Sequence, residues 1–161
     1  MKEIQLTQGK TALVDDEDYE ELNKYKWFVC KCGPHFYASR EGKMVNRKRF
    51  PMIRMHREIM KPPEGLKVDH INMDTLNNQR DNLRLCTHQQ NLRNRKSCKG
   101  STSRFKGVCW DKSRTKWMAT IKVDVGQQKY LGRHDSEVVA ARAYNNAAIN
   151  LFGDFARLNF I

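Results

Sequence analysis

The sequence predicts an α+β fold with three parts: a small β-rich N-terminal region, a core of two strands and a helix, and a three-stranded antiparallel sheet packed on one helix. Two observations predict this class. Short β-branched and aromatic runs alternate with turn residues along the chain, and the one long helical segment comes near the C-terminus. A length of 161 residues suits one domain of ~150 residues or two or three small modules.

Short strands and short helices are expected in the N-terminal region. Acidic side chains from Asp15 onward would stabilise the positive end of a helix that runs to about Asn23. A Gly33-Pro34 turn separates two β-rich runs and predicts a hairpin. The expected strands are Ile4–Leu6, Ala12–Val14, Lys26–Cys30 and His35–Ala38, and a further helix over Ile53–Met60 ends before Pro62-Pro63.

The middle of the chain is predicted to form strand, loop, strand and helix. A strand ends at Asp69-His70, and after a polar loop a second strand covers Leu83–Cys86. Thr87 followed three residues later by Gln90 is a capping-box pattern, so a helix is expected to begin at Thr87. Asn91 then falls in its first turn, facing back toward the strand pair.

The last third of the chain predicts a sheet with one free face. Strands are expected at Lys106–Trp110, Lys116–Val123 and Gln128–Leu131, and an alanine-rich helix follows from Ser136 to about Leu151. Small alanine side chains let this helix approach one face of the sheet closely. Candidate contacts on the other face are Lys106, Trp110, Lys116, Lys122, Gln128 and Tyr130, although an amphipathic sheet with solvated lysines fits the same pattern.

Charge indicates a polyanionic partner. The formal net charge is +12, yet residues 1–22 carry two basic and seven acidic side chains, so the positive excess lies after them. Six basic residues without an acid lie between Arg93 and Lys106, and they include Arg95 and Lys96. Such a run suits a linker along a phosphate backbone, and a solvated charge run is the alternative.

Composition also disfavours several classes of protein. No apolar run approaches the ~18 residues of a membrane span, so we expect no membrane insertion. The polar first residues lack the apolar stretch of a signal peptide. Five unevenly spaced cysteines favour reduced thiols, and a cytoplasmic protein of a bacterial or phage-infected cell is therefore expected.

Residues at the predicted strand end can supply hydrolytic chemistry. Asp69 offers a carboxylate oxygen and Asn91 an amide oxygen, a donor pair suited to one hard divalent cation. His70 can accept a proton from water near neutral pH. Each residue alone would usually belong to an ordinary turn, but together they suit phosphodiester hydrolysis.

The segment from Met55 to Arg95 resembles the His-Asn-His endonucleases of phages and introns, which have a ββα-metal core. The resemblance is carried by Val68-Asp69-His70-Ile71-Asn72, Asn78-x-Arg80-x-Asn82-Leu83-Arg84 and Thr87-His88-x-x-Asn91. It implies that Asp69 and Asn91 hold Mg²⁺ or Mn²⁺, that His70 is the general base, and that Asn82 orients this base through its amide. His56 is expected to pack or contact phosphate, and His88 to lie at the helix start or contact DNA. Cys30-Lys31-Cys32 lacks the spacing of the zinc sites in some relatives, so zinc is not predicted.

Residues 102–160 resemble the Apetala-type, or ethylene-response-factor, DNA-binding domain. The likeness lies in Phe105-Lys106-Gly107-Val108, Lys116-Trp117, Tyr130-Leu131-Gly132 and the alanines of 140–148. It implies that the sheet enters the major groove. Other residues replace the base-reading arginines of plant members, so their GC-box preference is not carried over. These replacements are Lys106, Cys109, Asp111, Lys122 and Gln128.

These features predict a metal-dependent, site-selective, homing-type endonuclease that cuts double-stranded DNA, with a monomer favoured. The expected parts are a β-rich region (1–54), a nuclease module (55–98), a basic linker (99–104) and a DNA-binding domain (105–161). A non-catalytic, sequence-specific DNA-binding regulator is the alternative, and the joint presence of Asp69, His70, Asn82 and Asn91 favours the enzyme. An RNA binder is disfavoured because the aromatic motif of RNA-recognition sheets is missing.

Overall fold

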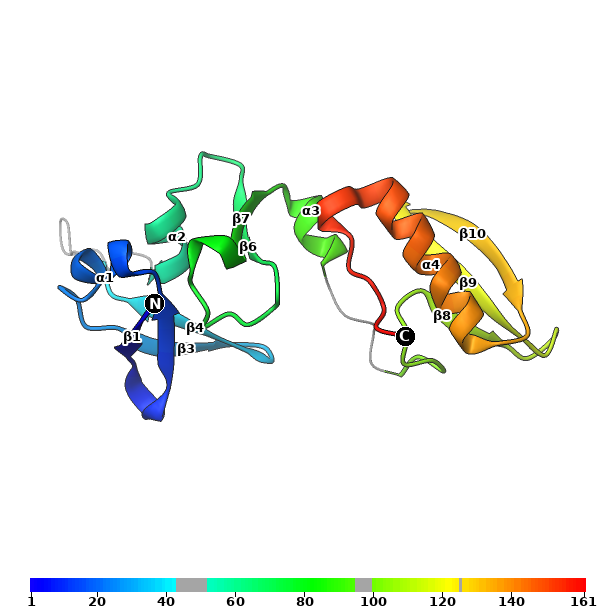
Figure 1. The fold of residues 1–161 in the computed structure, drawn as a ribbon, viewed down its shortest axis with the longest axis horizontal. Helices are drawn as coiled ribbons and strands as arrows, with labels where there is room; N and C mark the ends of the chain where they lie inside the picture. Colours follow the sequence, from blue (N-terminus) through cyan, green and yellow to red (C-terminus); the bar gives the residue numbers. More distant parts are fainter. Residues whose placement is uncertain (43–51, 95–99, 125) are drawn as a thin grey trace. The chain divides into compact units, whose positions relative to one another are not determined.

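The structure is a computed structural model that describes residues 1–42, 52–94, 100–124 and 126–161. It contains several small antiparallel sheets and short helices, which confirms the predicted α+β class (Figure 1). The chain divides into two compact units, Met1–Thr87 and His88–Ile161.

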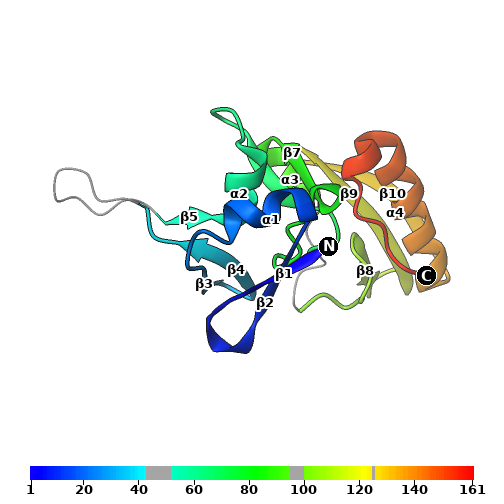
Figure 2. The ribbon, with the colours of Figure 1, turned by 60° about the vertical axis from the view of Figure 1, so that its left-hand side comes forward.

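The first unit begins with a hairpin, a helix and a second small sheet. Strands β1 (Lys2–Gln5) and β2 (Thr11–Val14) pair antiparallel, and α1 (Asp16–Leu22) follows. The predicted Gly33-Pro34 turn joins β3 (Phe28–Cys32) to β4 (His35–Arg40). The expected helix over Ile53–Met60 starts two residues late, because β5 (Ile53–Arg54) pairs with β4 before α2 (Met55–Met60) begins (Figure 2).

A further hairpin in this unit, β6–β7, carries the Asp69-His70 motif. β6 (Lys67–His70) pairs antiparallel with β7 (Leu83–Cys86), which agrees with the predicted strands. The long connection between them ends in a short 3₁₀ helix, η2 (Arg80–Asn82). This connection docks on β2, where Leu13 donates to the Leu76 carbonyl and accepts from the Asn78 amide. The β1–β2 and β6–β7 hairpins are thereby fixed to each other.

One hydrophobic core serves the whole first unit. Buried side chains from β1, β2, α1, β3 and β4 meet those of α2 and β7 in a single cluster. It contains Ile4, Ala12, Val14, Leu22, Trp27, Val29, Ala38, Met55, Ile59 and Leu83. The β-rich region and the Asp69-His70 hairpin therefore share one core.

The second unit is a three-stranded sheet with helices around it. After α3 (His88–Arg93) come β8 (Val108–Asp111), β9 (Lys116–Asp124) and β10 (Gln127–His134), with β9 in the centre. α4 (Glu137–Phe152) lies along one face of the sheet, and η3 (Gly153–Phe155) follows it (Figure 1). The predicted sheet packed on one helix is confirmed.

Close approach of α4 to the sheet requires small residues. Ala119, Ala140, Ala141 and Ala148 are fully buried at the contact. Gly107 has a φ of 75°, and a Cβ atom there would lie 2.2 Å from the Tyr144 ring and 2.5 Å from the Thr120 carbonyl oxygen. Only glycine combines this backbone conformation with this contact.

Candidate active site and nucleic-acid interface

Asp69 and Arg84 form a cross-strand ion pair on the β6–β7 hairpin. The two residues are direct partners in the antiparallel register. Arg84 donates from Nε (3.0 Å) and Nη2 (2.8 Å) to the same carboxylate oxygen, Asp69 Oδ2. Because Asp69 is only 7% exposed, the guanidinium offsets much of the cost of burying the carboxylate charge.

His70 lies at the end of the same strand and is also buried. Burial lowers the pKa of His70 below its usual value of 6.5, against the opposing effects of Asn78 and Asp69. The ring is therefore neutral at pH 7. A neutral imidazole can accept a proton, as a general base must.

Asn78 selects the tautomer of His70. Its Oδ1 lies 3.4 Å from His70 Nε2, and its Nδ2 donates to the Leu76 carbonyl, which fixes the amide orientation. An amide oxygen can only accept, so this contact favours the proton on Nε2. The lone pair then resides on Nδ1. Sequence reasoning quoted Asn78 as part of a motif but gave it no role.

Asn82 acts on the loop and not directly on the imidazole. Its Oδ1 accepts from the Asn72 amide, its Nδ2 donates to the Asn77 carbonyl, and its own carbonyl accepts from the Ile71 amide. These three bonds fix the chain just after His70. Among the described residues, the amide facing the His70 ring is that of Asn78, so a positioning role for Asn82 works through the backbone.

Other charged pairs anchor the same loop to the start of the chain. Arg80 donates to both carboxylate oxygens of Asp18 and pairs with Glu17 at 2.7 Å, while its backbone amide donates to Asp15. The acidic segment predicted from composition therefore holds the loop that leads to Asn82.

Two aromatic rings pack around His70. The His56 ring lies 5.0 Å from the His70 ring in an edge-to-face arrangement, and the Tyr37 ring lies 5.6 Å and 6.2 Å from these two rings. Burial, followed by the positive charge possible at His70, lowers the pKa of His56 to about 3. His56 is buried and packs against these rings, which is one of the two roles expected for it. Tyr37 joins them from the predicted strand His35–Ala38, where the sequence offered no candidate site residue.

The donor set suits a hard divalent cation. Asp69 contributes a buried carboxylate, and the described part of the first unit holds no cluster of three or more His, Cys, Asp or Glu side chains that would form a complete cage. A single carboxylate leaves most coordination positions to water and substrate oxygens, the arrangement usual for Mg²⁺. Asn91 belongs to α3 in the second unit, and its role as a ligand stays a prediction.

The free face of the second unit carries most of the predicted DNA contacts. The β9–β10 register pairs Lys122 with Gln128 and Thr120 with Tyr130, and strand alternation places Lys116 on this face too. Arg133 also lies there, 2.7 Å from Asp111 and 3.2 Å from the Tyr130 hydroxyl. Sequence reasoning did not select Arg133.

The expectation that Trp110 shares this face is wrong. Trp110 pairs with Trp117, and the two rings meet edge-to-face at 5.0 Å on the side covered by α4. Trp117 itself packs against the buried cluster around Phe105 and Val108. The prediction placed Trp110 on the free face together with Lys106. Pairing with β9 instead puts Trp110 beside Trp117, on the face that α4 covers.

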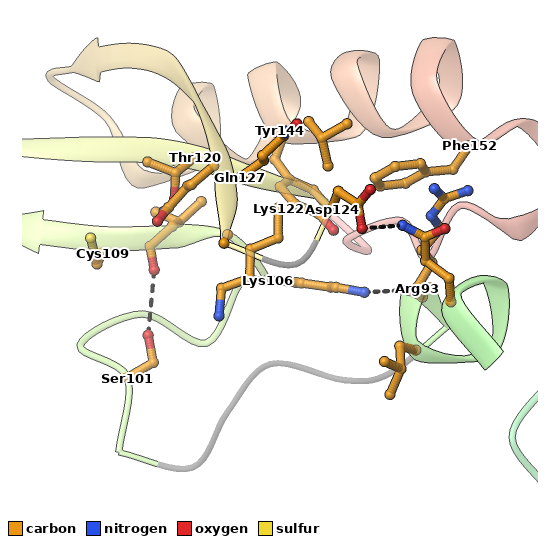
Figure 3. Close-up of a pocket in the computed structure, with 17 residues that line it drawn as sticks. Arg93, Ser101, Lys106, Cys109, Thr120, Lys122, Asp124, Gln127, Tyr144 and Phe152 are labelled. Atoms are coloured by element: carbon orange, nitrogen blue, oxygen red, sulfur yellow. Dashed lines mark hydrogen bonds between the residues drawn. The ribbon is translucent and has the colours of Figure 1, made fainter.

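Two other basic residues, Arg93 and Lys106, line a cavity of about 840 Å³ in this unit (Figure 3). The Arg93 guanidinium lies 4.3 Å from the centre of the Phe152 ring, and the Lys106 ammonium donates to the Arg93 carbonyl. Gln89 of α3 donates to Asp124 at 2.7 Å. Arg93 and Lys106 therefore hold α3 within the unit, while Arg95 and Lys96 lie outside the described residues.

No helix among the described residues is long and apolar enough to cross a membrane.

Comparison with known proteins identifies the motif that includes Asp69 and His70. A family model described as HNH endonuclease matches residues 61–93. Protein 3.8 of Escherichia phage T7 is 39% identical over 95 residues, which are 59% of this chain and 77% of that protein. An uncharacterized HNH endonuclease of Acanthamoeba polyphaga mimivirus is 35% identical over 154 residues, 95% of this chain and 76% of that protein. The chain belongs to the HNH endonuclease family. Like the family, it is a DNA endonuclease, a hydrolase of phosphodiester bonds.

One segment of this HNH endonuclease resembles a different group of proteins. A segment of 59 residues, 37% of the chain, is 44% identical to an ethylene-responsive transcription factor of Arabidopsis thaliana and covers 13% of that protein. No solved structure matches the HNH endonuclease. The resemblance to plant factors is thus confined to one segment.

Proposed function

We propose that this protein is a site-selective, homing-type endonuclease that cuts double-stranded DNA with Mg²⁺ or Mn²⁺ and acts as a monomer. Four parts are assigned to it: a β-rich region (1–54), the nuclease module (55–98), a basic linker (99–104) and a DNA-reading domain of Apetala type (105–161). The observation that carries the proposal is the buried, neutral His70 beside the Asp69–Arg84 pair.

His70 acts as the general base. Its Nδ1 accepts a proton from water while the water oxygen bonds to phosphorus, and the bond between phosphorus and the leaving oxygen breaks. The leaving oxygen takes a proton from solvent. Asn78 holds the ring through Nε2, and Asn82 fixes the backbone that follows the ring.

Asp69 and Asn91 hold the divalent ion. When bound, the ion supplies positive charge for the phosphate oxygens that become more negative during hydrolysis. Arg84 keeps the Asp69 carboxylate oriented through Oδ2.

The second unit selects the DNA site. A three-stranded sheet with an exposed basic and aromatic face fits the major groove, and Lys116, Lys122, Gln128 and Tyr130 share that face. Partial similarity to plant DNA-binding factors supports this assignment. Further positive charge near the phosphate backbone of DNA would come from Arg93, Arg95, Lys96 and Lys106.

Cleavage of supercoiled plasmid tests the proposal. Nicked or linear products should form with Mg²⁺ or Mn²⁺ and vanish in EDTA, and sequencing of the ends should show preferred sites. Asp69→Ala should reduce the rate more than Asn91→Ala, because it removes a charge as well as a ligand. Full activity in chelator would contradict metal dependence.

A further inference from the structure

The β3–β4–β5 sheet turns a polar face toward the catalytic histidine. His35, Tyr37 and Ser39 alternate along β4, and Arg54 of β5 pairs directly with Ser39. The intervening Phe36 and Ala38 point to the opposite side and pack in the hydrophobic core. Tyr37 stands 6.2 Å from His70, so this face borders the active site.

Arg54 is held on this face by the Tyr37 ring. Its guanidinium carbon lies 4.6 Å from the ring centre, a cation–π contact. Burial raises the pKa of the Tyr37 hydroxyl, and the nearby Arg54 charge opposes this shift. The cation is therefore positioned next to the residues of the proposed reaction.

Arg54 differs from the other partly buried arginines of the first unit. Arg40 pairs with Glu58 and Arg84 with Asp69. No carboxylate lies within ion-pair distance of Arg54 in the described part of the chain. A partly buried cation without an ion-pair partner is costly unless a ligand supplies one.

The neighbouring hydroxyl also points to a ligand on this face. Ser39 is fully buried, and its Oγ has no hydrogen-bond partner among the described residues. Buried polar groups are normally hydrogen-bonded. The Ser39 hydroxyl can therefore still make a hydrogen bond beside Arg54.

We propose that Arg54 binds the phosphate that is cut, with Tyr37 as the platform that aims its guanidinium. This inference rests on the proposed function of His70 and adds a catalytic residue from outside the motif. The guanidinium would donate two hydrogen bonds to phosphate oxygens and stabilise the extra negative charge of the transition state.

Single-turnover cleavage of supercoiled plasmid with Mg²⁺ tests the role of Arg54. Arg54→Ala should lower the rate at saturating protein by ~10²-fold, with DNA affinity in EDTA changed less than about threefold. Arg57→Ala, which removes an exposed arginine on α2, is the matched control and should change neither. Added guanidinium ion should restore part of the rate of Arg54→Ala but none of that of His70→Ala.

The platform is tested in the same assay. Tyr37→Phe keeps the ring and should cut at close to the wild-type rate, whereas Tyr37→Leu should resemble Arg54→Ala. Circular dichroism and thermal unfolding of each variant separate a loss of fold from a loss of function. A folded Arg54→Ala that cuts at the wild-type rate, or that guanidinium does not rescue, overturns the inference.

A binding measurement keeps this inference separate from the proposed function. If wild type does not cut, or if His70→Ala cuts like wild type, the role of His70 has failed. The ¹⁵N–¹H signal of Arg54 Nε in the full chain, followed while a short DNA duplex is added in EDTA, still decides the role of Arg54. It should shift while that of Arg57 does not, and an unmoved Arg54 signal contradicts phosphate binding.

Discussion

At the scale of single residues, burial leaves His70 in the form that the proposed general base requires. Desolvation lowers its pKa, so the ring is neutral, and the contact with the Asn78 amide oxygen favours the proton on Nε2. His70→Ala should reduce the cleavage rate by ~10²–10⁴-fold, the usual contribution of a general base. DNA affinity should remain near wild type, and undiminished cleavage would remove His70 from the mechanism.

His56 predicts how stability depends on pH. Above about pH 6.5 this histidine is neutral in both folded and unfolded chains. Below it, the unfolded chain takes up a proton, while the folded chain does not until about pH 3, because the buried ring resists charging. Stability is therefore lost as the pH falls through this window, by on the order of 3 kcal/mol between pH 6.5 and pH 4 from this group.

Urea unfolding between pH 7 and pH 4 measures this effect. His56→Leu should flatten the fall in unfolding free energy with decreasing pH, whatever its effect at pH 7. His88→Gln, which changes an exposed histidine, should leave the slope unchanged. An equal slope in His56→Leu and wild type would show that other groups control acid sensitivity.

At the scale of elements, substitutions on the two faces of the C-terminal sheet should affect DNA binding differently. Lys122 lies on the free face, whereas Lys129 pairs with Ile121, whose side chain points toward α4. Lys122→Ala should therefore weaken DNA binding more than Lys129→Ala, although both remove one charge from an exposed position. Fluorescence anisotropy with labelled duplexes would measure both.

Substitution of Tyr130 can distinguish a contact with a DNA base from a contact with the phosphate backbone. A phosphate contact weakens binding to all sequences and lowers the salt slope by about one, whereas a base contact costs ~1–3 kcal/mol at one position. Its side chain is 52% exposed on the free face, so Tyr130→Ala should relax the choice of base at one position. Uniform weakening across a randomised set of sites would instead assign Tyr130 to the backbone.

At the scale of the whole molecule, two separate cores predict a division of labour. The first unit has its own buried cluster and contains Asp69, His70 and Asn82. A fragment of residues 1–99 should keep the first unit with Asp69, His70 and Asn82, yet lose affinity and site preference together, because most predicted DNA contacts lie beyond it. Equally selective cutting by this fragment would move specificity to the basic segment 23–60.

Much of this arrangement follows from local sequence. The Gly33-Pro34 turn, the strands around Asp69 and Leu83, and the alanine-rich helix were all predictable, because turn residues and side-chain periodicity act over a few neighbouring positions. The Asp69-His70 motif likewise indicated a nuclease before any contact was known. The sequence by itself therefore determined the fold class, the hairpin that carries Asp69 and His70, and the family.

Only the tertiary structure decided which side chains meet. Strand pairing put Trp110 against Trp117 under α4, and the packing of β4 and α2 brought Tyr37 and His56 to His70. It also placed Asn78 against the ring and left Asn82 to hold the loop. These contacts join residues up to 33 positions apart (His70 to Tyr37). The physical reason is that strand register and side-chain packing depend on the whole core, and the local sequence pattern does not determine them.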